Sequence, residues 1–216
     1  MDFSLIVFIL EMVGTVAFAV SGVMVAKDRK MDIFGAVVLG CATAVGGGMI
    51  RDLILGIVPP AMFQKPGYVT VAAMSSLVFF CLERYGRRWQ KLLASNQERN
   101  DQLLNVADSI GLAAFVVVGC RTAIDAGHSD NFFLCAFVGV LTGIGGGILR
   151  DMLAAQMPLI MRKRVYGIAA IVGAVVYCLL LRVHVDVVMA SVACMVITCL
   201  IRFLAIHYRW NLPSFR

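Results

Sequence analysis

The sequence predicts an all-α membrane protein with seven transmembrane helices, and three observations lead to this fold class. Hydrophobic residues make up 61% of the 216 residues and charged residues only 15%, whereas a soluble domain carries about 25% charged residues. Apolar runs recur along the chain, each long enough to cross about 30 Å of hydrocarbon. A Gly-Gly-Gly motif followed by Arg-Asp occurs twice. This composition excludes a soluble enzyme, a disordered chain and a disulfide-stapled secreted protein.

Hydropathy places the seven helices along one transmembrane domain, residues 1–216. The expected spans are 3–26, 32–57, 67–83, 104–121, 131–155, 165–181 and 185–206. Only segment 84–103 is long and polar enough to be a linker. We therefore expect a first three-helix unit at 3–83, a cytoplasmic linker at 84–103, a second unit at 104–181 and a seventh helix at 185–206.

The distribution of basic residues predicts the orientation in the membrane. With the N-terminus outside, the inner loops and the C-terminal segment carry 14 of the 19 Lys and Arg residues, and the outer loops carry 3. Basic residues accumulate on the cytoplasmic side of membrane proteins, so the N-terminus is expected outside and the C-terminus in the cytoplasm. The net charge of +6 is thus a topology signal, and we expect no nucleic-acid partner.

The chain contains an internal duplication. Residues 46–52, Gly-Gly-Gly-Met-Ile-Arg-Asp, recur at 145–151 as Gly-Gly-Gly-Ile-Leu-Arg-Asp, and the flanking residues follow at nearly the same offset. Each unit holds three spans, an odd number, so the second unit must run opposite to the first. Inverted repeats of this kind place the functional site of many transporters at the repeat interface.

The glycine triplets predict kinks in the second and fifth helices. Each glycine costs a helix about 1 kcal/mol relative to alanine, and a broken helix is tolerated in lipid only where it is buried or lines water. The expected pore hinges are Gly46, Gly47, Gly48, Gly145, Gly146 and Gly147. Close helix packing is the alternative, because small residues spaced four apart also form helix contacts.

Six ionisable residues inside the expected spans are candidates for gating or solute binding: Glu11, Arg51, Asp52, Asp108, Arg150 and Asp151. Topology places the first three toward the outside and the last three toward the cytoplasm. Each set then holds one arginine and two carboxylates, with a formal charge of −1. A charge at mid-bilayer costs at least about 2.5–3.5 kcal/mol, so these groups must pair or face water. They predict a gated polar path, with a structural ion-pair lock as the alternative.

The doubled motif in a seven-helix chain resembles the prokaryotic trimeric intracellular cation (TRIC) channel family, also labelled the bacterial glycine transporter domain family. The resemblance covers about residues 3–206. It implies a prokaryotic inner-membrane homotrimer in which each subunit has its own pore, lined by the second and fifth helices. Animal members carry a lysine-containing motif at the break in the second helix and bind an inositol lipid there, and this chain has no lysine near either triplet.

The expected function is therefore a channel for monovalent cations, potassium and sodium. A transporter of glycine or a similar small zwitterion is the alternative, because each set offers an arginine for a carboxylate and carboxylates for an ammonium.

The chain has no G-x-S-x-G or H-E-x-x-H motif, and its seven cysteines and three histidines lack metal-ligand spacing. We expect no enzyme activity, no cofactor and no metal. The basic residues and Trp89 of segment 84–103 predict contact with anionic lipid.

Overall fold

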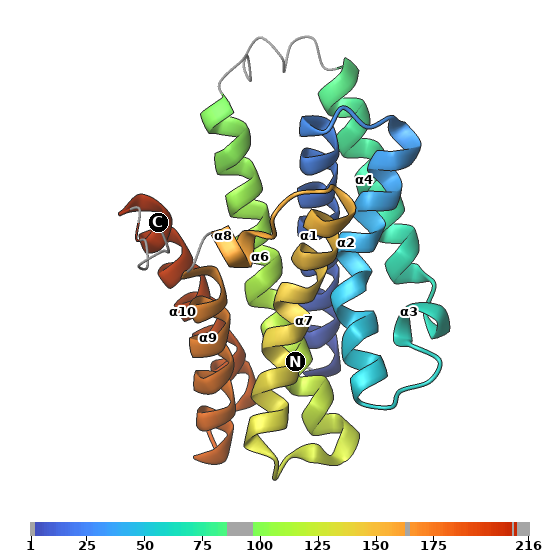
Figure 1. Ribbon diagram of the computed structural model, residues 1–216. Coiled ribbons are helices and arrows are strands. Elements are labelled where there is room, and N and C mark those ends of the chain that lie inside the picture. Colours follow the sequence, from blue (N-terminus) through green and yellow to red (C-terminus); the bar gives the residue numbers. More distant parts are fainter. Residues whose placement is uncertain (1–2, 86–96, 163–164, 209, 211–216) are drawn as a thin grey trace.

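The computed structural model describes residues 3–85, 97–162, 165–208 and 210, and regular structure within these ranges is helical (Figure 1). The long helices are α1 Phe3–Asp28, α2 Ile33–Ile54, α4 Gly67–Tyr85, α6 Gln97–Ala123, α7 Phe132–Leu153, α9 Val165–Arg182 and α10 Val187–His207. A π-helical segment, Ile124–His128, extends α6, and the short helices α3 Ala61–Gln64 and α8 Leu159–Arg162 follow α2 and α7. Seven described helices are long and apolar enough to cross a membrane, so the predicted fold class is confirmed.

Helices in corresponding places of the two halves run in opposite directions. In Figure 1, α1 rises through the view while α6 descends, and α2 descends while α7 rises. We call the upper end, where α1 and α4 finish and α6 begins, the linker end. This arrangement is the one that an odd number of spans in each half requires.

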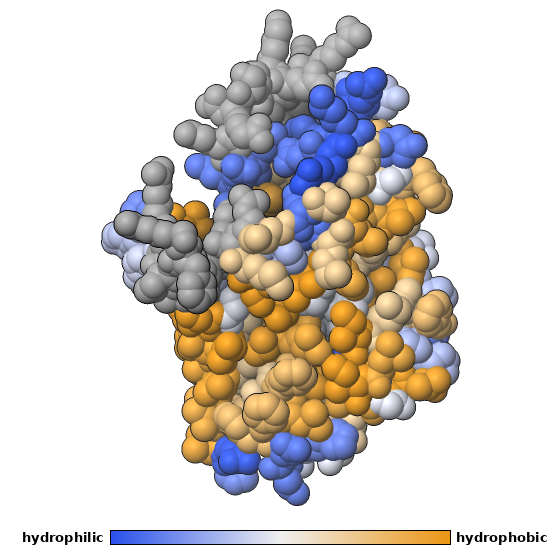
Figure 2. All heavy atoms as spheres, in the orientation of Figure 1, coloured by the Kyte–Doolittle hydropathy of each residue, from blue (hydrophilic) through white to orange (hydrophobic). Residues whose placement is uncertain are grey.

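Helix α6 is the central helix of the bundle. Of its most apolar 18-residue window, 72% is buried, compared with 11% for α4. It packs against α1, α7, α9 and α10, while α2 and α4 pack around α1. Large apolar side chains on the outer faces, including Phe34 and Phe133, are exposed in the isolated chain. Figure 2 shows the resulting apolar belt between two hydrophilic ends, which is the surface expected to face lipid or other subunits.

Two boundaries differ from the sequence prediction by more than two residues. Helix α6 begins at Gln97 instead of residue 104, so part of the expected linker is helical. Helix α2 ends at Ile54 instead of residue 57. Hydropathy detects only the apolar part of a helix, and α6 starts with a polar turn. Residues 86–96, which hold Arg87, Arg88, Trp89 and Lys91 of the predicted lipid contact, lie outside the described residues.

The glycine triplets do not interrupt the helices in which they lie, and a kink or hinge at these glycines stays a prediction. The backbone is α-helical through Gly46–Gly48 in α2 and through Gly145–Gly147 in α7. The reason lies in packing: a Cβ on Gly47 would collide with the carbonyl oxygen of Thr142, and one on Gly146 with the carbonyl oxygen of Thr43. The middle glycine of each triplet therefore lets α2 and α7 touch backbone to backbone, as the packing alternative requires.

Candidate functional site

The first set of charged residues, which we call the Arg51 cluster, consists of Arg51, Asp52 and Glu11. The Nε of Arg51 donates to Oδ1 of Asp52 over 2.8 Å. The second carboxylate oxygen of Asp52 accepts from the backbone N–H of Ala61 at 2.8 Å. Glu11 accepts a hydrogen bond from the hydroxyl of Tyr68. The two neighbours Arg51 and Asp52 thus pair with each other, and within the described residues no ion pair joins Arg51 to Glu11.

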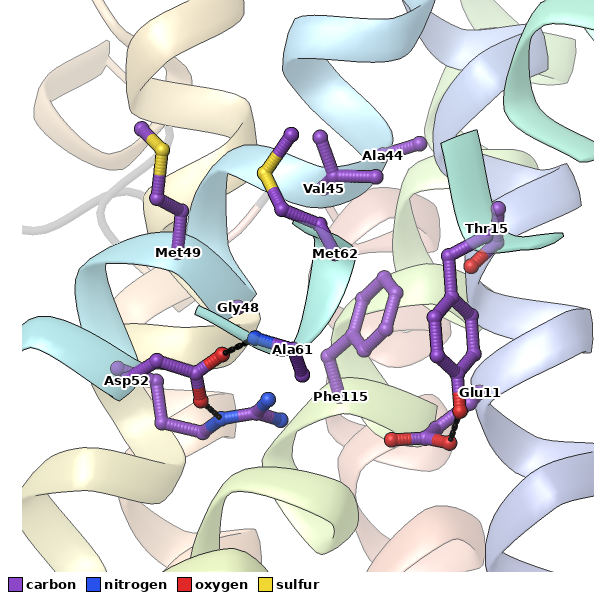
Figure 3. A pocket seen from close by; sticks show the side chains of 12 residues that line it. Glu11, Thr15, Ala44, Val45, Gly48, Met49, Asp52, Ala61, Met62 and Phe115 are labelled. Carbon is purple, nitrogen blue, oxygen red and sulfur yellow. Dashed lines mark hydrogen bonds and ion pairs between the residues drawn. The ribbon is translucent and has the colours of Figure 1, made fainter. Parts of the chain in front are cut away.

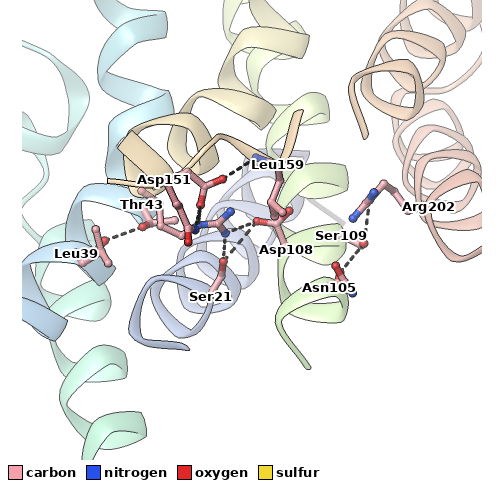
Figure 4. Close-up of polar contacts among 11 residues, drawn as sticks. Ser21, Leu39, Thr43, Asn105, Asp108, Ser109, Asp151, Leu159 and Arg202 are labelled. Atoms are coloured by element: carbon pink, nitrogen blue, oxygen red, sulfur yellow. Dashed lines mark hydrogen bonds and ion pairs between the residues drawn. The ribbon is translucent and has the colours of Figure 1, made fainter. Parts of the chain in front are cut away.

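The second set, the Arg150 cluster, consists of Arg150, Asp108 and Asp151 and lies near the linker end (Figure 4). Arg150 donates to Asp151 Oδ1 at 2.9 Å and to Asp108 Oδ1 at 2.6 Å. It also donates to the hydroxyl of Ser21 in α1. The side chains of the three charged residues are 0% exposed. This cluster therefore ties α1, α6 and α7 together through a buried guanidinium.

The two clusters repeat one geometry at opposite ends of the bundle. In each, the arginine pairs with the aspartate that follows it, and the free oxygen of that aspartate receives the first N–H of a short helix. Asp151 accepts from Leu159 at 2.7 Å, as Asp52 does from Ala61. These contacts close the loop after α2 and after α7 in the same way, and hold each aspartate in place.

The clusters differ in their access to water. A cavity of about 40 Å³ adjoins the Arg51 cluster and is lined by Glu11, Arg51, Asp52, Tyr68 and Phe115, among others (Figure 3). That volume has room for a few water molecules, since a single water needs about 10–15 Å³ on this scale. The Arg150 cluster has no exposed side chain. Water thus has room beside the Arg51 cluster, whereas the side chains of the Arg150 cluster are enclosed by protein.

A strap of two polar side chains, Arg29 and Gln156, covers the Arg150 cluster at the linker end. Gln156 donates to Asp151 Oδ1 at 2.8 Å. Arg29, just after α1, donates to the Gln156 side-chain oxygen at 3.2 Å and to the carbonyl of Ala155 at 3.5 Å. The residue corresponding to Gln156 in the first half is Ile57, which has no polar side chain. The strap therefore belongs to one end only.

Between the clusters lies an apolar barrier. The rings of Phe18 in α1 and Phe115 in α6 have centroids 5.2 Å apart, and the two side chains are 0% and 8% exposed. Phe18 also lies against Gly146. Together with the contact of α2 and α7, this pair separates the two charged clusters.

Similarity in sequence and in structure to known proteins identifies the family. The family model described as Glycine transporter matches residues 8–84 and 105–182. A chain solved in work on the structural basis for conductance through TRIC cation channels is 34% identical with a TM-score of 0.82. The alignment covers 100% of this chain and 98% of that one. The chain belongs to the TRIC channel family.

Other relatives match over comparable lengths. The TRIC orthologue from Rhodobacter sphaeroides is 31% identical with a TM-score of 0.82, covering 95% of this chain and 99% of that one. The inner membrane protein YadS of Escherichia coli (strain K12) is 40% identical over 212 residues, 98% of this chain and 97% of YadS. These are membrane proteins and not enzymes, which confirms that part of the prediction.

Sequence reasoning missed one residue of this TRIC protein in particular. Arg202 in α10 was expected among the cytoplasmic basic residues, but it is 1% exposed. Its Nε lies 3.3 Å from the hydroxyl of Ser109, and its guanidinium carbon is 4.6 Å from the ring centre of Tyr166. The available signal was its place inside an apolar span, since an arginine there must find a partner or water.

Proposed function

We propose that this protein is a channel for monovalent cations such as potassium and sodium, with one path inside each subunit of a homotrimer. The observation that carries the proposal is the pair of arginine–carboxylate clusters on either side of the Phe18–Phe115 barrier in a single bundle. Two polar ends separated by a narrow apolar waist form an hourglass. The similar solved structures named as TRIC cation channels, one of them as trimeric, support both the function and the assembly.

The charge of the Arg51 cluster favours cations. Its two carboxylates and one guanidinium leave a formal charge of −1 beside the cavity, and rings or clusters of carboxylates attract cations in channels. A divalent cation such as calcium prefers six to eight oxygen ligands, and a guanidinium in the same cavity opposes a double charge. Because α2 and α7 keep their helical hydrogen bonds, we assign ion attraction to these carboxylates and not to freed backbone carbonyls.

We propose that the structure represents a closed path. Opening would hydrate the Phe18–Phe115 barrier and break the pairs that Arg150 makes with Asp108 and Asp151. Water entering the site lowers the cost, since the attraction between unit charges at 4 Å falls from about 4 kcal/mol at an effective dielectric of 20 to about 1 kcal/mol in bulk water. Each arginine thus acts as a latch on its own end.

A transporter of glycine or a similar zwitterion is the second candidate. The observation that favours it is the cavity that presents the guanidinium of Arg51 and the carboxylate of Glu11 together. A guanidinium binds carboxylates well, and a carboxylate can hold an ammonium. A cavity of about 40 Å³ is small for an amino acid, so this candidate requires a second, wider conformation.

We propose that the linker end faces the cytoplasm and the N-terminus faces the outside, in a prokaryotic inner membrane. Arg202 is buried, so the basic count changes from 14 to 13 (14 − 1) against 3, and the bias remains strong. Anionic lipid at segment 84–103 stays part of this proposal, because Arg87, Arg88 and Lys91 would lie at the inner leaflet.

The test is flux through purified protein in proteoliposomes, with potassium and labelled glycine compared side by side. A channel gives potassium current that grows with voltage and no saturable glycine uptake. Saturable glycine uptake with counterflow would establish the transporter instead. Liposomes without protein are the control for flux that does not pass through the protein.

A further inference from the structure

Arg202 is a buried cation that has no carboxylate partner in the described part of the chain. It comes from α10, the helix that has no counterpart in the first half of the chain. Among the described residues no carboxylate lies within 4.0 Å of its nitrogens, and its NH2 nitrogen has no hydrogen-bond partner. Its polar contacts are the hydroxyl of Ser109 at 3.3 Å and the face of the Tyr166 ring. A buried charge with such weak compensation is costly, so its position calls for an explanation.

The neighbours of Arg202 lead directly to the Arg150 cluster. Ser109 follows Asp108 in α6, and Figure 4 shows Arg202 reaching from α10 toward this stretch of α6. The Tyr166 hydroxyl lies 3.4 Å from the point where a Cβ of Gly147 would stand. The NH2 of Arg150 and the Oδ1 of Asp108 lie 3.8 Å from that same point. Tyr166 thus has Arg202 against its ring and the Arg150 cluster around its hydroxyl.

The charge of this end changes when Arg202 is counted. Arg150, Asp108 and Asp151 alone sum to −1, and Arg202 brings the sum to zero. The Arg51 cluster stays at −1, because α10 is the extra helix. Water and salt screen surface charges within about 8–10 Å, but buried charges much less. The exposed Arg29 of the strap is such a screened surface charge and is left out of the sum. A cation on the path therefore meets buried charges that sum to −1 at one end and to zero at the other.

We infer that Arg202 sets the charge of the Arg150 end and thereby limits its preference for cations, an inference that rests on the proposed channel function. A unit charge acting over roughly 10 Å at an effective dielectric of about 20 to 40 changes the local concentration of a monovalent ion about 4- to 16-fold. Removing the charge should raise the potassium-to-chloride permeability ratio by at least this factor, because chloride is depleted by the same potential that enriches potassium.

A purely structural role makes a different prediction. Arg202 also connects α10 to α6 and α9, so its removal could loosen the bundle without any effect on selectivity. Arg202→Lys separates the two roles, because lysine keeps the charge but loses the planar group that stacks on Tyr166 and reaches Ser109. The charge role predicts a wild-type permeability ratio for Arg202→Lys, and the structural role predicts the same defect for Lys and Gln.

The experiment measures reversal potentials under a potassium chloride gradient in planar bilayers, for trimers isolated by size-exclusion chromatography. Arg202→Gln should raise the potassium-to-chloride ratio, and Asp108→Asn should lower it. The double variant Arg202→Gln/Asp108→Asn restores the zero sum and should return toward wild type. Arg182→Gln is the matched control, since Arg182 also stacks on a ring, that of Phe132 at 5.1 Å, but is exposed at the opposite end.

The outcomes separate the inference from the proposed function. If the wild-type protein passes potassium and Arg202→Gln leaves the ratio unchanged, the charge role is wrong and the channel stands. If Arg202→Gln does not assemble, Asp108→Asn decides, and an unchanged or higher ratio in that variant overturns the inference. If wild-type protein passes no potassium, the proposed function fails and the inference fails with it.

Discussion

Gly47 and Gly48 are neighbours in one helix, and the structure predicts opposite effects of changing each to alanine. A Cβ on Gly47 meets the backbone carbonyl of Thr142, which no side-chain rotation can relieve, whereas a Cβ on Gly48 comes no closer than 3.7 Å to the Arg51 guanidinium. Either change gains about 1 kcal/mol of helix propensity. Overpacking at Gly47 costs about 1–3 kcal/mol, so the two variants should differ in stability by about that amount.

The assay is thermal unfolding of the detergent-purified trimer, followed by fluorescence-detected size-exclusion chromatography. For a chain of this size a difference of 1 kcal/mol shifts Tm by about 2–4 °C, so Gly47→Ala should melt about 2–12 °C below Gly48→Ala. Gly146→Ala, which meets the carbonyl of Thr43, should behave like Gly47→Ala. If Gly47→Ala is as stable as Gly48→Ala, the backbone contact is not what the middle glycine provides, and the hinge interpretation regains its support.

Three further predictions concern the two arginines, the strap and the membrane orientation. Arg150→Ala strands Asp108 and Asp151 in a dry core and should cost about 3–5 kcal/mol in denaturant unfolding. Arg51→Ala, beside a cavity that admits water, should cost less, and equal losses would contradict the difference in burial. Gln156→Leu removes the strap and should speed potassium leak from loaded liposomes, with Ile57→Leu as the matched control; identical leak in both variants would show that the strap holds nothing closed. Impermeant reagents applied from outside should label a tag at residue 1 but not one at residue 92, and the reverse pattern would invert the proposed topology.

The sequence by itself determined the number of spans, the pairing of the two motifs and which charged residues gather at each end. These are local properties: the length of an apolar run sets what can cross a bilayer, and an ionisable residue inside such a run must find a partner wherever the chain folds. The residues of the Arg150 cluster could be predicted from their expected depth in the membrane, because Asp108 and Arg150 lie at similar distances from the same membrane face.

The tertiary structure decided which helices touch and which polar groups meet. A glycine triplet in a sequence is compatible with a hinge and with a close helix contact. Only the short distances to the carbonyls of Thr142 and Thr43 show that Gly47 and Gly146 lie in a contact between α2 and α7. Hydropathy likewise could not tell that Arg202 turns toward α6 instead of the cytoplasm. The same limit applies to the strap, since Arg29 and Gln156 are separated by 127 positions and meet only after the helices pack.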